Sequence, residues 1–189
     1  MEALRTIGYL VMRPTEAWGA IARETTTVDA LLRRYILPLS ALAPIATFIG
    51  METFDQSWDV THGYLVPHDR IFNAAATTFF ATIASIFALA AIMTLIAPMY
   101  RCKRDFLAAL KVAVHGASPL LLSGAMLVLP AMVVVSMVAL CHTLFLYCVG
   151  ASVVLEVRRD QAEFVGISLL LLTFVSMMAG MAAASVGLI

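Results

Sequence analysis

The sequence predicts an all-α membrane protein with five transmembrane helices. Hydrophobic residues make up 62% of the 189 residues and charged residues only 13%, against about 25% charged residues in soluble domains. Five apolar runs are each long enough to cross a hydrocarbon core about 30 Å thick as a helix. These runs are apolar on every face, which excludes the alternating strands of a membrane barrel. The composition therefore excludes a soluble enzyme, and a net charge of zero gives no basic field for nucleic acid.

Residues 1–34 are expected to form short helices at the membrane surface rather than a span. Pro14 can open the second of these helices. Trp18 is predicted to anchor it at the level of the lipid headgroups, and Thr27 has the side chain of an N-cap for the helix that follows. The first helix is indicated by an apolar stripe at helical spacing, formed by Leu4, Ile7, Leu10 and Val11.

The remaining chain is expected to form one five-helix domain over residues 35–189. The second and fifth predicted spans contain no charged residue, and the second is long enough to tilt. Helices are the only spanning structure that satisfies the backbone of such runs within lipid. The five predicted spans cover residues 35–54, 71–99, 106–129, 131–151 and 164–187.

The charges between the spans predict the orientation. With the N-terminus in the cytoplasm, eleven of the twelve Lys and Arg residues fall on the cytoplasmic side, and only Arg70 falls outside. The positive-inside rule therefore places the N-terminus in the cytoplasm and the C-terminus in the periplasm or outside the cell. The expected location is a bacterial inner membrane, with the lipid bilayer as the first partner.

Two histidines lie within the third and fourth predicted spans. Counted from the turn at Pro130, His115 and His142 differ in depth by only about 4–5 Å. They can form a metal site with Cys141 or a titratable pair that relays a proton. They can also be neutral side chains that join the two helices through hydrogen bonds, either to each other or to Ser118, Thr143 or Tyr147.

Prolines and small residues mark the remaining features of the spans. Pro119, next to Ser118, removes one backbone hydrogen bond and predicts a kink in the third span. Ser176, Gly180 and Ala184 follow one another at intervals of four residues in the fifth span. Such a stripe favours close helix packing, either within the chain or in an oligomer.

We expect neither catalytic activity nor a cofactor, because the sequence carries none of the usual catalytic motifs. It lacks a phosphate-binding loop, a nucleophile elbow and a pair of intramembrane aspartates. A lipid-directed enzyme would have to use the one polar cluster of the outer loop, which consists of Asp55, His62, His68 and Asp69.

Several short motifs give the chain a family resemblance. Residues 118–124 read SPLLLSG, and residues 146–150 read LYCVG. The N-terminal part contributes Pro14, Trp18, Ile21, Glu24, Tyr35, Pro38 and Gly50. With these residues the chain resembles the Yip (Ypt-interacting protein) domain family, and within it the small bacterial inner-membrane proteins of the YohC type. Val114 and His115 stand where that family often has Gly-Tyr.

The resemblance implies a non-catalytic membrane protein with five spans. We therefore expect a scaffold, membrane-organising or accessory factor that acts by association, as a homo-oligomer or with another membrane protein. The alternative is a small channel or transporter for a proton, a metal or a small solute, which would use His115 and His142.

Overall fold

The computed structural model describes residues 2–51, 53, 68–128, 132–158 and 160–185, and over these residues the chain forms helices and no strand. Five helical segments are long and apolar enough to cross a membrane. The all-α class and the predicted number of spans are therefore confirmed. The five segments are Val28–Gly50, Arg70–Tyr100, Phe106–Val128, Val134–Val154 and Gln161–Ala179.

The first spanning segment begins seven residues earlier than the sequence predicts. The Thr27 hydroxyl accepts a hydrogen bond of 3.2 Å from the N–H of Ala30 and caps α3 (Val28–Leu31). A π-helical turn follows (η1, Leu32–Ile36) and leads into α4 (Leu37–Gly50). Pro38 has no N–H to donate to the turn before it, and such a widened turn accommodates the missing bond.

The other spans follow their predicted runs closely. α6 (His68–Ile96) continues into a 3-10 turn, η3 (Ala97–Tyr100). α7 (Phe106–Ser123) continues into η4 (Gly124–Val128). Asp105 is the N-cap of α7, and its carboxylate accepts hydrogen bonds from two backbone N–H groups of the first turn. The last two spans are α8 (Val133–Val154) and α9 (Gln161–Ser185).

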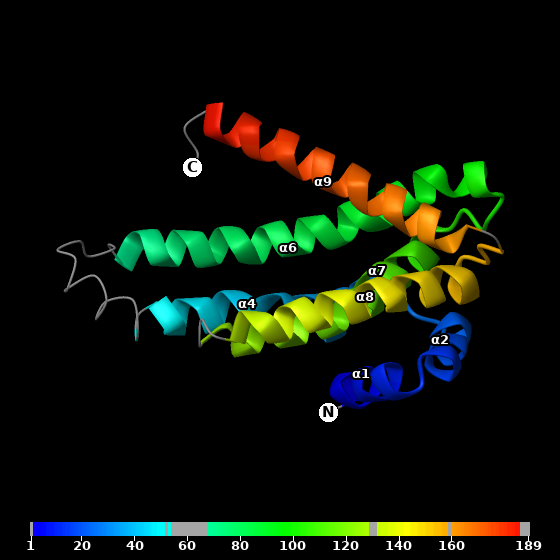
Figure 1. The fold of residues 1–189 in the computed structure, drawn as a ribbon, viewed down its shortest axis with the longest axis horizontal. Helices are drawn as coiled ribbons and strands as arrows, with labels where there is room; N and C mark the ends of the chain where they lie inside the picture. Colours follow the sequence, from blue (N-terminus) through cyan, green and yellow to red (C-terminus); the bar gives the residue numbers. More distant parts are fainter. Residues whose placement is uncertain (1, 52, 54–67, 129–131, 159, 186–189) are drawn as a thin grey trace.

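Helix α7 forms the centre of the bundle (Figure 1), and every side chain from Ala108 to Ser118 is buried. α8 runs antiparallel beside it, as shown by hydrogen bonds from Tyr147 to Ala113 and from Ser123 to Ser136. α4 and α6 also pack on α7. The third span is therefore enclosed by protein, while its neighbours have exposed apolar faces.

Helix α9 packs on the bundle along its first half, up to Leu172, and is fixed most firmly near its beginning. The Tyr100 hydroxyl donates to the Glu163 carboxylate over 2.9 Å, and the rings of Tyr100 and Phe164 lie 5.3 Å apart. Beyond its first half α9 diverges from α6 and α8 (Figure 1). Phe164 is fully buried, whereas Leu170 is 68% exposed.

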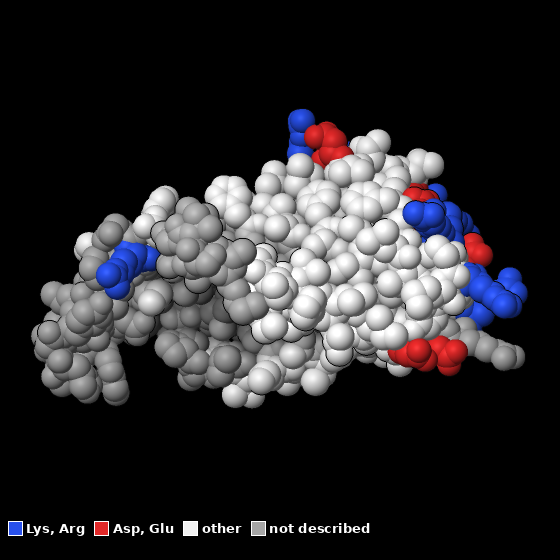
Figure 2. Space-filling view, turned by 90° about the horizontal axis from the view of Figure 1, so that it is seen from above, with Lys and Arg blue, Asp and Glu red and all other residues white. Residues whose placement is uncertain are grey.

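Of the two N-terminal helices, α1 (Glu2–Met12) and α2 (Pro14–Arg23), α2 lies at one end of the bundle and α1 folds back along its side (Figure 1). Both helices have the sequence positions that the sequence predicts, and their place at the membrane surface stays a prediction. On the face that Figure 2 shows, most Lys and Arg side chains gather toward the end of the molecule where α9 begins. We call this the charged end.

Candidate functional site

Three of the residues that carry the family resemblance, Trp18, Tyr35 and Tyr147, lie in one buried cluster where α2, η1, α7 and α8 come together. We call it the central cluster, and it consists of Trp18, Tyr35, Lys111, His115 and Tyr147. Each of these residues is at most 9% exposed. Segments about 130 residues apart in the sequence are therefore joined by contacts that include one lysine and one histidine within an apolar surrounding.

His115 lies at the centre of this cluster and is 2% exposed. Its ring is 4.7 Å from that of Tyr35 and 6.3 Å from that of Trp18, measured between centroids. Its Nδ1 lies 2.9 Å from the carbonyl oxygen of Lys111. A carbonyl only accepts, so Nδ1 carries the proton and donates, and Nε2 of the neutral ring is left as an acceptor. This Nε2 is buried and has no hydrogen-bond partner among the described residues.

Ser118 and Pro119 complete the turn of α7 that follows His115. Pro119 cannot donate to the carbonyl of His115, four residues earlier. The Ser118 hydroxyl donates to that same carbonyl over 2.6 Å. The serine thus supplies the bond that the proline removes, and the Ser-Pro pair is satisfied within its own helix.

Trp18 has a different environment from the one that the sequence predicts. Its side chain is fully buried inside the protein, so it packs within the bundle instead of anchoring at the headgroups. The indole lies over Gly150 of α8, where an added Cβ would come within 2.7 Å of a ring carbon. Gly150 therefore leaves the space that the indole occupies.

A second glycine creates the same kind of contact between α7 and α8. A Cβ on Gly116 would lie 2.4 Å from the ring of Tyr147. The Tyr147 hydroxyl donates to the carbonyl of Ala113 over 3.3 Å. Tyr147 thus fills the space left by one glycine and also satisfies its own polar group within the bundle.

Lys111 connects the N-terminal helices to the third span. Its side chain is buried, and Nζ donates to the carbonyls of Ile21, at 2.9 Å, and of Glu24, at 2.5 Å. These two carbonyls belong to the end of α2, where the backbone lacks further helical donors. A positive charge at a helix C-terminus also interacts favourably with the helix dipole. Lys111 is therefore the C-terminal cap of α2.

From the sequence alone, Lys111 is predicted only to add to the positive charge of the cytoplasmic side. The available signal was a single lysine inside the otherwise apolar start of a span. Such a side chain is costly in lipid and requires a partner. The partner was not identifiable, because main-chain carbonyls leave no pattern in the sequence.

His142 and Cys141 lie apart from the central cluster. The ring neighbour of His142 is Phe145 on its own helix, 6.0 Å away. Nε2 of each histidine lacks a partner and Nδ1 of His115 is bound to Lys111, so His115 makes no hydrogen bond to His142. Cys141 is exposed. Within the described part of the chain, no three His, Cys, Asp or Glu residues are grouped closely enough to hold a metal ion.

The other predicted positions lie outside the central cluster. Ser176 is exposed on α9, and Gly180 and Ala184 follow it on the same helix. His68 and Asp69 stand at the beginning of α6, with His68 exposed. Asp55 and His62 lie outside the described residues, so the outer-loop cluster stays a prediction.

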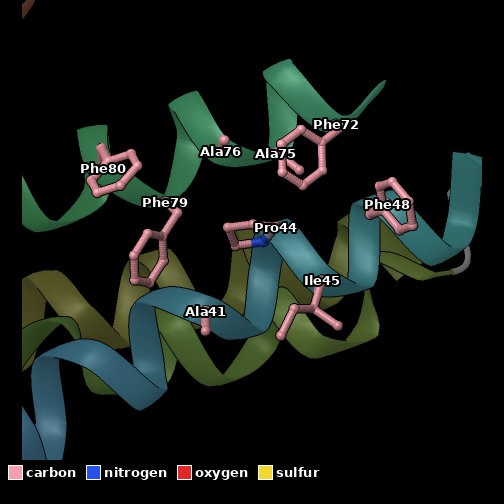
Figure 3. Close-up of a pocket in the computed structure, with 9 residues that line it drawn as sticks. All are labelled: Ala41, Pro44, Ile45, Phe48, Phe72, Ala75, Ala76, Phe79 and Phe80. Carbon is pink, nitrogen blue, oxygen red and sulfur yellow. The ribbon is translucent and has the colours of Figure 1, made fainter. Parts of the chain in front are cut away.

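Pro44 lines an open groove between α4 and α6 (Figure 3). The groove has a volume of about 360 Å³, and Phe79 and Phe72 line it from α6. All of its lining side chains are apolar, which suits contact with lipid chains. They are Ala41, Pro44, Ile45, Phe48, Phe72, Ala75, Ala76, Phe79 and Phe80.

Comparison with known proteins places these residues in a family. The model of the Yip1 domain matches residues 8–180, a range that includes both N-terminal and transmembrane motifs. No curated protein and no solved structure matches the chain. Since the match extends over nearly the whole sequence, the chain belongs to the Yip1 domain family.

Proposed function

We propose that this protein is a non-catalytic member of the Yip1 domain family that acts by association within the membrane. Its role is that of a scaffold, a membrane-organising factor or an accessory subunit, of the kind formed by the YohC-type proteins of bacterial inner membranes. The observation that carries this proposal is the set of hydrogen bonds that three polar side chains make within the membrane-spanning region. His115, Lys111 and Tyr147 all donate to main-chain carbonyls of their own chain.

Burying a polar side chain within a membrane costs free energy, so such residues mark a structural or functional role. In a conduit they line a path along which an ion or solute moves. Here Lys111 and His115 are enclosed by α2, η1 and α7. Lys111 donates to the end of α2, and His115 donates to its own helix. This arrangement favours a rigid platform over a transport path.

The outer surface of the bundle is consistent with association. The second half of α9 leaves the bundle and exposes large apolar side chains, including Phe174, Val175 and Met177. In a membrane such a surface meets lipid or another helix, and helix pairs in lipid form through packing and hydrogen bonds. A platform that holds one helix away from its core can present that helix to a partner.

We infer that the charged end faces the cytoplasm. The basic residues near α2, in the segment around Arg101–Arg104 and after α8 all belong to the side that the positive-inside rule assigns to the cytoplasm. Lys111, as the cap of α2, keeps the N-terminal helices on that side. The C-terminus then lies in the periplasm or outside the cell.

The test is association measured together with flux. Native membranes are crosslinked and solubilised in mild detergent, and the protein is purified at its natural expression level. We expect a dimer or a complex with another membrane protein, and liposomes containing the purified protein should show no proton or metal flux above empty liposomes. A strictly monomeric species without a partner would contradict the proposal, as would a flux that His142→Ala abolishes.

A further inference from the structure

A second groove in the membrane-spanning region differs from the apolar one between α4 and α6. It has a volume of about 500 Å³ and lies between α6, α7 and α8, where α9 diverges. α7 contributes Ala117, and α9 reaches it only with Leu169 and Leu172. Most of the α6 wall carries small and hydroxyl side chains, which permit close approach of another helix, and Ile86 and Leu89 follow toward the end of α6. Its hydroxyls are those of Thr77, Thr78, Thr82 and Ser85.

One side chain lining this groove has an unsatisfied polar group. Thr143 of α8 is 2% exposed, and its Oγ1 has no hydrogen-bond partner among the described residues. The threonines on the opposite wall are different, since Thr78 and Thr82 each donate over 2.8 Å to a carbonyl of their own helix. Thr143 therefore holds an unpaired donor in the buried wall of the groove, while Thr78 and Thr82 have oxygen atoms that can still accept.

The depth of Thr143 restricts what can satisfy it. It lies at the middle of α8, about 16 Å from either end at a rise of about 1.5 Å per residue. The hydrocarbon core is about 30 Å thick, so the ester carbonyls of a phospholipid lie near its edges and do not reach this depth. An acyl chain can fill the groove but leaves the hydroxyl unpaired. A transmembrane helix with a polar side chain at its middle both fills the groove and supplies an acceptor.

Helix α9 of this same protein has the required features. Leu172 and Thr143 line the same groove, so the next residue, Thr173, lies at a similar depth. Thr173 and Ser176 are both exposed, and Thr173 donates to Leu169, which leaves its oxygen free to accept. In a dimer whose two-fold axis lies along the membrane normal, each residue lies at the same depth in both copies. The α9 helix of each copy can therefore enter the groove of the other at the level of Thr143.

We propose that a second copy of this chain seats its α9 in the groove of the first. In this dimer the Thr143 hydroxyl donates to a hydroxyl of the incoming helix, while the small residues of α6 allow the helices to approach closely. The inference rests on the proposed function, because it names the partner through which association occurs.

Crosslinking in membranes tests the contact directly. Two differently tagged copies, each without its native cysteines, are expressed together, one with Thr143→Cys and the other with Thr173→Cys. We expect an oxidant to form a disulfide between the two tags. The matched control replaces Thr143→Cys by Val138→Cys, which lies on the same helix and is 67% exposed toward another direction. Equal crosslinking of test and control, or none in either, overturns the proposal.

A second measurement separates the hydroxyl from simple packing. Thr143→Val removes the donor and retains the shape, and it should raise the dimer dissociation constant in detergent about threefold to twentyfold, whereas Thr143→Ser should leave it nearly unchanged. The melting temperature of the monomer should not fall with either variant. An unchanged dissociation constant for Thr143→Val, or a monomer that retains a copurified lipid instead, overturns the proposal. If the protein does not dimerise but still binds another membrane protein, the result overturns the proposed homodimer and leaves the proposed function supported.

Discussion

The indole of Trp18 lies against Gly150, so that the second N-terminal helix is held to the fourth span by a residue without a side chain. The contact predicts that Gly150→Ala will destabilise the protein. The new Cβ would lie 2.7 Å from the indole, and the overlap should cost about 1–3 kcal/mol. Thermal unfolding in detergent, followed by tryptophan fluorescence, measures the change.

The matched control for this prediction is Gly166→Ala on α9. No atom lies within 4 Å of a Cβ added at Gly166. Alanine is also a better helix former than glycine. The melting temperature of this variant should stay the same or rise slightly. If both variants unfold at the same temperature as the wild type, Trp18 does not depend on the space at Gly150.

Gly116 and Tyr147 should behave as a coupled pair. Gly116→Ala places a Cβ 2.4 Å from the tyrosine ring and should lower stability. Tyr147→Leu alone should also lower it, because it removes the ring and its hydrogen bond to Ala113. The double variant should be less destabilised than the sum of the two, by about 0.5–3 kcal/mol in a double-mutant cycle. Simple additivity would show that the two side chains do not share one space.

Lys111→Met should loosen the N-terminal helices while the five spans remain. The carbonyls of Ile21 and Glu24 lose their donor, and a hydrogen bond from a charged group contributes about 1.5–3 kcal/mol. We expect faster hydrogen exchange over residues 17–24 and faster proteolysis after Arg23. Lys103→Met, at an exposed lysine, is the control. If α2 exchanges hydrogen and is cleaved at the same rate in both variants, Lys111 does not stabilise the end of α2.

Asp105 predicts a dependence of stability on pH. Partial burial raises the pKa of its carboxyl, but hydrogen bonds from the Ala108 and Leu107 N–H groups and the nearby Lys103 outweigh it, so the net pKa is lowered. A pKa that is lower in the folded state adds stability above the unfolded value of about 3.9, and this stability is lost as the pH falls through the folded pKa. The melting temperature should therefore decline in acid.

Asp105→Asn isolates this contribution, because asparagine is also a good N-cap but does not titrate. Its melting temperature should depend less on pH below about 4 than that of the wild type. An unchanged slope would show that other carboxyl groups, such as that of Glu16, dominate the acid response. The pKa of Glu16 is also lowered, first by its hydrogen bond from Tyr9.

Cys102 provides a test of the proposed orientation. It precedes α7 at the charged end, its thiol donates to the carbonyl of Ala97, and partial burial raises its pKa. In a variant with serine at the other two cysteines, a membrane-permeant maleimide should label Cys102 slowly, and faster as the pH rises. An impermeant maleimide should not label it in intact cells. Rapid labelling by the impermeant reagent would place the charged end outside.

The sequence predicted the elements of the fold because they depend on local properties. The length and uniform apolarity of the runs indicate the five spans, and the cap at Thr27 follows from its side chain. Helical spacing indicates the first N-terminal helix.

The candidate site could be predicted only in part, because its contacts depend on rotation of each helix about its own axis. Counting from Pro130 gives the depth of His115 and His142 but not the direction in which each ring points. In the structure Tyr147, not His142, meets Gly116 beside His115. Trp18 was expected at the headgroups because neither its burial nor the space at Gly150 is visible in a list of residues.

The attachment of α2 has a consequence for the order of events during biosynthesis. α2 leaves the ribosome before the spans to which it attaches, because its cap is residue 111 and the space for its indole is at residue 150. The N-terminal helices can therefore reach their final position only after the fourth span has been inserted. Until then the indole of the emerging chain lacks the space at Gly150 that receives it in the complete fold.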